Sequence, residues 1–172
     1  MNAQFTNFML EDFINFVQKE NLFKPDQKIL IAVSGGIDSI ILSKLFALAK
    51  FDFGIAHVNF SLRGEESLAD EVFVKKFAKT LKVPYHTICF DTNAFAEKEK
   101  LSTQLAARIL RYTWFEEIRI KNNYDFIATA HHQLDSAETM LINLTRGTGL
   151  AGFHGIPIKN GHIIRPLSFA SQ

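Results

Sequence analysis

A short apolar run at residues 29–33 leads directly into the segment Ser-Gly-Gly-Ile-Asp-Ser at residues 34–39, and an apolar helical pattern begins behind it. A continuous run of Ile, Leu and Val is typical of a strand in a parallel sheet that is covered on both faces. Paired glycines let the backbone turn tightly and approach an anion closely. Together with the hydroxyls of Ser34 and Ser39, the free N–H groups of the helix start favour a phosphate-binding loop.

Two better-known phosphate loops are excluded by the spacing of this segment. A Walker loop needs Gly-x-x-x-x-Gly-Lys-Ser/Thr and a dinucleotide fingerprint needs Gly-x-Gly-x-x-Gly, and neither is present here. The first lysine after the glycines is Lys44, which lies inside the predicted helix. The pattern is similar to the loop of enzymes that cleave ATP between its α and β phosphates, releasing AMP and pyrophosphate. An ordinary strand-to-helix turn with incidental glycines is the alternative.

The rest of the chain predicts an alternation of strands and helices. We expect strands at 29–33, 53–58, 85–89 and 125–130, and helices at 38–49, 65–81, 102–120 and 135–145. An amphipathic helix precedes them and is expected to cover the sheet, with apolar positions at Phe5, Phe8, Met9, Phe13, Phe16 and Val17. A hairpin or tight turn is expected around Asn160-Gly161. This order predicts an α/β fold with a doubly wound, mostly parallel sheet of about five strands and helices on both faces.

Composition excludes several classes of protein. The 172 residues are 47% hydrophobic, and 19 basic side chains nearly balance 18 acidic ones. The net charge therefore gives no indication of a nucleic-acid, membrane or acidic partner, although a local patch could still bind a polyanion. The single cysteine, Cys89, excludes an internal disulfide and a multi-cysteine zinc site. No basic leader and no apolar run of about 20 residues is present, which predicts a cytoplasmic protein. The 17 phenylalanines are interpreted as dense core rather than as a base-stacking platform.

Ligands of such sheets bind at the carboxyl ends of the strands. Residues 34–39, 57–63 and 130–135 follow the ends of predicted strands, so we expect them to lie together at one edge of the sheet. Asp135 and Glu138 lie three residues apart and are expected to share a helix face there. Three roles are possible for these carboxylates: capping the helix, binding Mg²⁺, or binding a cationic substrate amine. Of the adjacent pair His131 and His132, one is expected to be functional and one packed. For His57, packing and nucleotide contact are both open.

Arg108 and Arg111 lie three residues apart in the helix expected at 102–120. An arginine fork aimed at the site neutralises charge on a phosphate or in the transition state of adenylyl transfer. Arg111 is the candidate for that role, whereas a solvated helix face is the preferred interpretation of Arg108.

Several motifs together resemble the tRNA(Ile)-lysidine synthetase family in content and order. They are Ala-Val-Ser-Gly-Gly-Ile-Asp-Ser at 32–39, His-Val-Asn at 57–59, Leu-Arg-Gly at 62–64, Ala-Arg-Ile-Leu-Arg-Tyr at 107–112, Ala-His-His at 130–132 with Glu138-Thr139, Arg-Gly-Thr-Gly-Leu at 146–150 and Ile-Arg-Pro-Leu at 164–167. The loop alone indicates only a superfamily that also holds GMP synthetases, asparagine synthetases and tRNA thiolases. The later motifs carry the specific likeness.

The resemblance implies an adenine-nucleotide α-hydrolase-like fold and an enzyme that uses ATP and Mg²⁺. Its reaction would adenylate the C2 oxygen of the wobble cytidine in tRNA(Ile) with a CAU anticodon, after which the ε-amine of L-lysine displaces AMP. The residues that match the family motifs receive these roles: Ser34, Gly35, Gly36, Asp38, Ser39 and His57 for ATP, Asp38 and Asp135 for the metal, Asp135 and Glu138 for lysine, and His131, Asp135 and Arg111 for catalysis.

The sequence departs from the family pattern at two positions, and the resemblance also implies how much of the family's architecture these residues contain. The family usually has paired aspartates where this chain has Leu134-Asp135, and commonly histidine in place of Phe60, a change expected to matter little. We expect residues 1–172 to form one N-type ATP pyrophosphatase catalytic domain without the family's carboxyl-terminal tRNA-binding region. Such a domain is expected to bind ATP and to modify tRNA weakly or not at all. The rival interpretations are an ATP-dependent tRNA thiolase, which Cys89 alone supports poorly, and a noncatalytic adenine-nucleotide-binding module.

Overall fold

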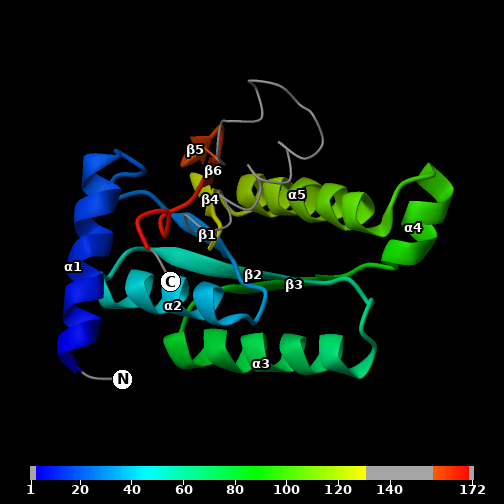
Figure 1. Cartoon of the computed structure of the whole chain (residues 1–172), viewed down its shortest axis with the longest axis horizontal. Coiled ribbons are helices and arrows are strands. Elements are labelled where there is room, and N and C mark those ends of the chain that lie inside the picture. The colour runs from blue at the N-terminus through cyan, green and yellow to red at the C-terminus, as the bar shows by residue number, and fades with distance from the viewer. Residues whose placement is uncertain (1–2, 131–156, 171–172) are drawn as a thin grey trace, which may run out of the picture.

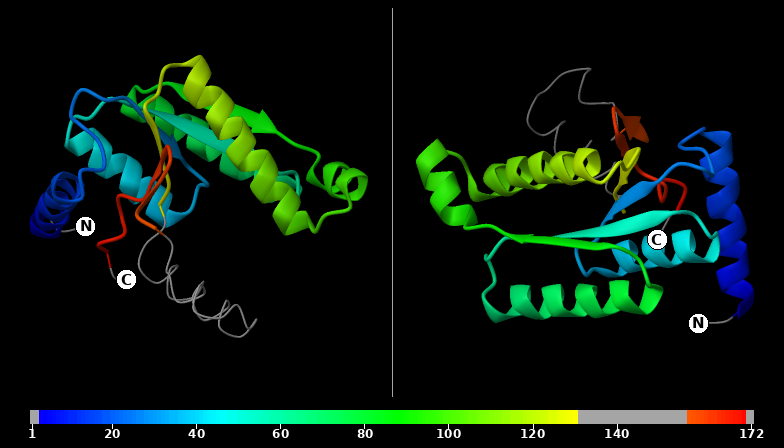
Figure 2. Two further views of the ribbon diagram at one scale, coloured as in Figure 1. Left: turned by 90° about the horizontal axis from the view of Figure 1, so that it is seen from above. Right: turned by 180° about the vertical axis from the view of Figure 1, so that it is seen from behind.

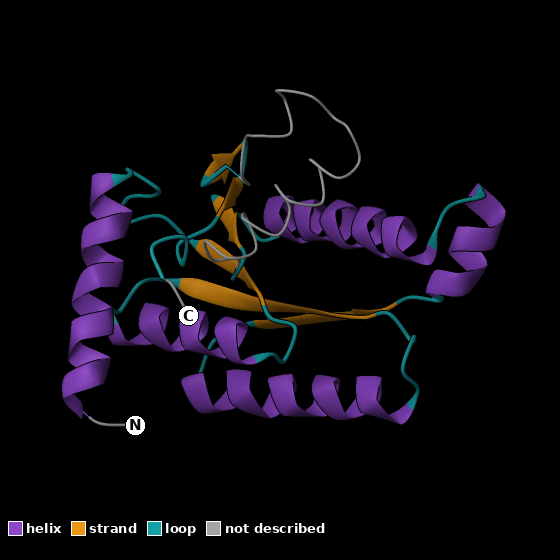
Figure 3. Cartoon of the chain, viewed as in Figure 1, coloured by secondary structure: helices purple, strands orange, loops and turns teal. Residues whose placement is uncertain are grey.

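The computed structural model describes residues 3–130 and 157–170, with side chains from residue 8 onward. Helices flank a central sheet in these residues (Figures 1 and 3). The helices are α1 (Ala3–Lys19), α2 (Ile37–Leu48), α3 (Glu65–Leu81), α4 (Thr92–Glu99) and α5 (Thr103–Lys121). The strands are β1 (Ile29–Ala32), β2 (Phe53–Asn59), β3 (Tyr85–Cys89), β4 (Phe126–Ala128), β5 (Lys159–Asn160) and β6 (Ile163–Ile164).

The described strands form one sheet in the order β3-β2-β1-β4-β6-β5. Every neighbouring pair is parallel except β5 with β6, which form the hairpin expected around Asn160-Gly161. Ile29 lies opposite Phe53 on one side and Phe126 on the other, so β1 is central. The mostly parallel, doubly wound α/β fold is confirmed, with six strands in place of about five. The carboxyl ends of β1, β2 and β4 therefore meet at one edge of the sheet.

Each face of the sheet has its own core because side chains alternate along a strand. Ile29, Ile31 and Ile55 face one side, where they pack with residues of α1, α2 and α3. Leu30 and Ala56 face the other side, where they pack with Trp114 and Phe115 of α5 and with Tyr124 and Ile127. The two layers of helices are seen on opposite sides of the sheet in Figure 1, and again from above and behind in Figure 2.

The amino-terminal helix is amphipathic, as predicted, but packs chiefly on α2 and the turn after it rather than across the sheet. Phe13 is fully buried, with its ring centroid 5.4 Å from that of Phe46 and 6.2 Å from that of Phe51. Phe8, which was expected on the same apolar face, is 70% exposed. These contacts hold the carboxyl end of α2, at the opposite end of that helix from the loop 34–39. The region around α1 therefore stabilises the fold and lies away from the phosphate loop.

Helix α4 was not predicted from the sequence. Its amino end is capped by Asp91, whose carboxylate accepts a hydrogen bond from the Ala94 N–H at 3.0 Å. Helix α5 begins as predicted after Ser102, whose hydroxyl oxygen accepts from the Leu105 N–H at 3.3 Å. The other predicted boundaries within the described residues hold to within a few positions, whereas the helix expected at 135–145 lies outside them. None of the described helices combines the length and apolar character needed to cross a membrane.

Candidate functional site

The segment 34–39 forms a tight loop between β1 and the first turn of α2. Gly35 has φ +99°, a conformation that residues with a side chain rarely adopt. The Ser34 hydroxyl oxygen accepts a hydrogen bond from the Gly36 N–H at 3.2 Å. Gly36 occupies the N-cap position of α2, and no side chain caps this end of the helix. The helix start therefore offers N–H groups to a ligand, which is the arrangement that binds anions.

Ser39 lines the cavity, but its hydroxyl proton is used within the loop. It is 5% exposed, and its hydroxyl donates a hydrogen bond to the Gly36 carbonyl at 2.7 Å. Because a hydroxyl has one proton, that donor is already used in this arrangement. Ser39 therefore braces the loop from within, and its direct contact with ATP stays a prediction.

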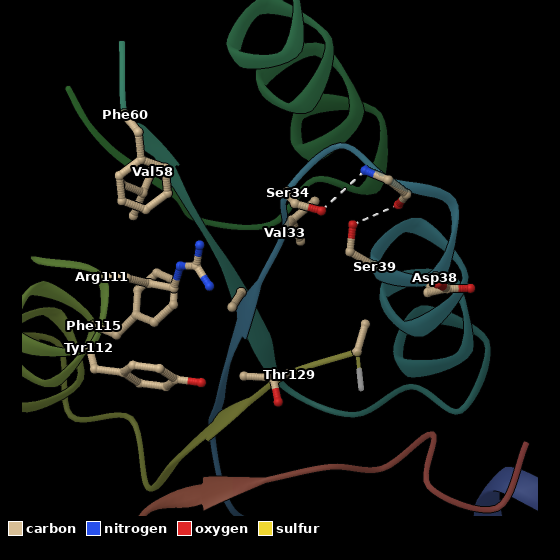
Figure 4. Close-up of a pocket in the computed structure, with 13 residues that line it drawn as sticks. Val33, Ser34, Asp38, Ser39, Val58, Phe60, Arg111, Tyr112, Phe115 and Thr129 are labelled. Carbon is tan, nitrogen blue, oxygen red and sulfur yellow. Dashed lines mark hydrogen bonds between the residues drawn. The ribbon is translucent and has the colours of Figure 1, made fainter. Parts of the chain in front are cut away.

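A cavity of about 310 Å³ opens beside the loop, at the carboxyl ends of β1, β2 and β4 (Figure 4). Its volume lies in the range typical of small-molecule sites. Ser34, Gly36, Asp38 and Ser39 line one wall, and Arg111 lines the wall formed by α5. The remaining lining residues are Ala32, Val33, Val58, Phe60, Tyr112, Phe115, Thr129 and Ala130. The structure thus brings five predicted site residues, far apart in the sequence, around one cavity.

Arg111 points from α5 into this cavity (Figure 4). Its guanidinium lies over the ring of Phe60, with 5.1 Å between the carbon and the ring centroid. Burial lowers the pKa of Arg111, and the positive charge of Arg108 adds to that effect. Among the described residues, no carboxylate forms an ion pair with Arg111. A half-buried cation without a carboxylate partner favours binding of an anionic ligand.

Phe60, which stands where the family commonly has histidine, forms part of the cavity wall beneath Arg111. Its carbonyl accepts a hydrogen bond from the Thr92 hydroxyl at 2.9 Å, and Thr92 is buried at the start of α4. The unpredicted helix α4 therefore holds the strand end that carries Phe60. Arg108, by contrast, is exposed, as expected, and lies over the ring of Tyr112 at 5.1 Å.

His57 lies beneath the loop rather than in the cavity wall. It is 3% exposed, and its Nδ1 lies 2.8 Å from the Val33 carbonyl oxygen. Because a carbonyl only accepts, Nδ1 carries the proton, and Nε2 has no hydrogen-bond partner among the described residues. The ring steadies the last residue before the loop, which favours the packing interpretation of His57. Its contact with ATP stays a prediction.

Three further cavity residues, Thr129, Tyr112 and Phe115, were not singled out from the sequence. Thr129 directly follows β4, so the rule that ligands bind at the carboxyl ends of strands could have identified it. Tyr112 and Phe115 lie one and four positions after Arg111, which places them on neighbouring parts of the same helix surface. The hydroxyl of Tyr112 points toward Thr129 across the floor of the cavity (Figure 4).

The predicted residues His131, Asp135 and Glu138 lie outside the described part of the chain. Within residues 3–130 and 157–170, no three His, Cys, Asp or Glu side chains come together as a metal site would require. Asp38, the remaining metal candidate, lines the cavity in the first turn of α2. One protein carboxylate beside a phosphate loop suits a cation that takes most of its other ligands from water and substrate phosphates.

Comparison with known proteins agrees with this geometry. A protein-family model described as a PP-loop domain matches residues 6–171. The chain is similar to the tRNA(Ile)-lysidine synthase of Bacteroides thetaiotaomicron, with 47% identity over 90% of this chain and 36% of that protein. It is also 45% identical to the enzyme of the same name from Parabacteroides distasonis, over 91% of this chain and 36% of the relative. The chain thus spans about a third of the length of these curated relatives.

Two solved structures share the fold at low sequence identity. The U34-tRNA thiolase NcsA from Methanococcus maripaludis matches 94% of this chain and 59% of its own, with a TM-score of 0.67 and 18% identity. The NH3-dependent NAD synthetase from Campylobacter jejuni matches 81% of this chain and 60% of its own, with a TM-score of 0.58 and 20% identity. Since the family model covers nearly the whole sequence and the loop, sheet and cavity have the expected arrangement, the chain belongs to the PP-loop domain family.

Proposed function

We propose that this chain carries the ATP-dependent active site of a tRNA(Ile)-lysidine synthetase. In this reaction the wobble cytidine of tRNA(Ile) with a CAU anticodon is adenylated at its C2 oxygen. The ε-amine of lysine then attacks C2, which gives lysidine and AMP, with pyrophosphate released in the first step. The observation that carries the proposal is the cavity with the phosphate loop on one wall and Arg111 on the other. The identities of 45–47% with enzymes of that name support the choice of substrates.

The loop supplies the binding site for the β and γ phosphates. The uncapped start of α2, the left-handed conformation of Gly35 and the hydroxyl of Ser34 all suit a polyphosphate. A helix terminus alone contributes only about 0.3 to 1 kcal/mol toward an exposed anion. The loop must therefore act together with further positive charge to hold a triphosphate.

Magnesium and Arg111 are the candidates for that charge. Asp38 would hold Mg²⁺ from the loop side, together with Asp135 if the predicted metal role of that residue is correct. Bound there, Mg²⁺ would neutralise charge on the phosphates. Arg111, on the opposite wall of the cavity, would stabilise the negative charge that develops at the α phosphate during adenylyl transfer.

The second half of the reaction rests on residues outside the described segments. We assign the lysine ammonium to Glu138 and Asp135, because carboxylates hold a cationic substrate. His131 is the candidate to take the proton from the attacking amine, since its ordinary pKa lies close to neutral pH.

The decisive test follows the α phosphate of labelled ATP in single-turnover reactions, with the protein in excess over a CAU-anticodon tRNA(Ile), Mg²⁺ and lysine. We expect AMP only when the tRNA is present, and lysine attached to the tRNA. Release of AMP without tRNA, or ATP binding with no AMP under any condition, would contradict the proposal. The second of these outcomes would favour a noncatalytic adenine-nucleotide-binding module.

Two glycine variants make a matched pair for this test. Gly35→Ala strains the loop at φ +99°, and we expect it to abolish tRNA-dependent AMP formation. Gly161→Ala also places alanine at a positive φ, +58°, but in the turn between β5 and β6, where an added Cβ meets nothing within 4 Å. Both changes strain the backbone, so a loss of AMP formation confined to Gly35→Ala would reflect the loop rather than the general cost of the substitution.

A further inference from the structure

An ion pair lies directly behind the phosphate loop. Arg63, in the connection between β2 and α3, donates from Nη2 to Oδ2 of Asp70 at 2.8 Å. The other carboxylate oxygen of Asp70 lies 3.4 Å from the position that a Cβ would occupy on Gly35. A carboxylate therefore lies next to the space that a side chain at Gly35 would occupy, beside the loop proposed to hold the polyphosphate.

The position of Arg63 is fixed by local structure. Its backbone N–H donates to the Ser67 hydroxyl at 3.2 Å, and Ser67 is buried in the first turn of α3. Glu66 lies 3.7 Å from Nη1, a second and weaker contact. The connection thus fixes the backbone of Arg63, and its side chain, which is 63% exposed, pairs with Asp70.

Asp70 by itself would oppose the proposed function of the loop. Its side chain is 36% exposed, so solvent screens its charge only in part. Charges of like sign a few ångströms apart repel each other even when the effective dielectric constant is close to that of water. A free carboxylate behind Gly35 would therefore weaken the binding of any polyphosphate at the start of α2.

We propose that Arg63 is a positioning residue for the polyphosphate, because it neutralises Asp70 behind the phosphate loop. The inference rests on the proposed function, which places ATP on that loop. The carboxylate fills the space behind Gly35, and the guanidinium cancels its charge, so the loop keeps its shape and its attraction for anions. Arg63 acts through Asp70 and does not itself contact the phosphates.

The test is a double-mutant cycle on the binding of inorganic pyrophosphate with Mg²⁺, measured by calorimetry at low salt. Arg63→Gln should weaken binding roughly three- to tenfold, because Asp70 is then uncompensated. Asp70→Asn should bind at least as tightly as the wild type. The double variant should return to within about twofold of the wild type, since neither charge remains, and Arg63→Lys should retain most of the affinity.

Three results would overturn this inference. If the double variant binds as weakly as Arg63→Gln, the guanidinium contacts the phosphates directly. If Asp70→Asn alone binds more weakly than the wild type, the carboxylate itself takes part in binding the ligand. If all variants bind alike, the pair is only a surface contact. A wild-type protein that binds no pyrophosphate would contradict the proposed function itself, which separates the two failures.

A second ion pair provides the matched control. Glu116 and Arg119 approach to 2.7 Å on α5, outside the cavity beside the loop. Glu116→Gln and Arg119→Gln remove charges of the same kind, so neither should change pyrophosphate affinity. Adenosine binding should also stay constant in every variant, because the proposed effect acts on the phosphates. Circular dichroism of each variant checks that the fold is retained.

Discussion

Two arginines of α5 lie eight residues apart in opposite electrostatic surroundings. Arg119 donates two hydrogen bonds to Glu116, at 2.7 and 2.8 Å, and a third to the Tyr124 carbonyl at 3.1 Å. The hydrogen bonds that Arg119 donates to Glu116 raise the pKa of Arg119. Burial instead lowers the pKa of Arg111, which lies over Phe60 without a carboxylate partner among the described residues. Within the described residues, Arg119 is paired with a carboxylate and Arg111 is not.

The two cavities beside these arginines show the same contrast. The one next to Arg119 has a volume of about 570 Å³, against about 310 Å³ for the one next to Arg111. Its polar groups are already paired: Asp125 accepts from the Lys28 N–H at 2.8 Å and from Gln27 at 3.3 Å. The smaller cavity borders an uncapped helix start and a half-buried cation. Charge without a partner among the described residues, rather than volume, therefore distinguishes the cavity of the proposed site from the larger one.

The largest effect is expected from removing the charge at Arg111. Arg111→Gln should lower the single-turnover rate of AMP formation roughly 100-fold, because one charged donor to the developing anion is lost. ATP affinity should change much less, since the loop still holds the polyphosphate. Arg119→Gln is the matched control on the same helix, and its rate should stay within about twofold of the wild type. Equal losses in the two variants would break the distinction between the arginines.

A stability effect is expected at the end of the sheet near Arg119. A Cβ on Gly54 would lie 2.0 Å from the Tyr124 hydroxyl oxygen and 2.8 Å from its ring, and Tyr124 is 2% exposed. Gly54→Ala should therefore lower the free energy of unfolding by about 1–3 kcal/mol, measured by urea denaturation. The folded variant should bind ATP like the wild type, because this clash lies away from the phosphate loop.

Tyr124→Phe provides the background that tests the cause of this loss. It removes the hydroxyl oxygen, the atom nearest to the added Cβ, although it also removes the hydrogen bond to His86 at 3.0 Å. Gly54→Ala should cost less in that background than in the wild type. An undiminished cost would mean that the ring or the backbone, rather than the hydroxyl, opposes the alanine.

The parts of the fold and site that could be predicted are those encoded locally. The loop follows from a buried strand, two glycines and a helix start, all within eleven residues of one another. The placement of Arg111 follows from the helical pattern and from the rule that ligands bind at one edge of a parallel sheet. The same rule would have indicated Thr129 had it been applied to the residue directly after β4.

The parts that were missed depend on packing between distant segments. Phe60 forms a wall beneath Arg111 only because Thr92, on the unpredicted α4, holds its carbonyl. The exposure of Phe8 likewise depends on where α1 ends its contact with α2. No local pattern contains these two results.

The smallest expected effect is a pH dependence of fold stability that comes from the ion pair between Arg119 and Glu116. The hydrogen bond from Arg119 holds the pKa of Glu116 below its usual value, with further help from His162. Because the folded pKa is the lower one, the pair stabilises the fold above the unfolded value of about 4.3 and loses that contribution as pH falls through the folded pKa. The side chain of Glu116 is 39% exposed, so we expect less than about 1 kcal/mol.

Glu116→Gln should remove this part of the acid sensitivity. Urea denaturation between pH 6 and pH 3 should show the wild type losing more stability than the variant below pH 4.3, while AMP formation at neutral pH stays the same in both. Equal acid sensitivity would mean that the ion pair contributes nothing to the fold. A loss of activity in Glu116→Gln would mean that the satisfied end of α5 also serves the reaction, and the contrast between the two arginines would then no longer separate structure from function.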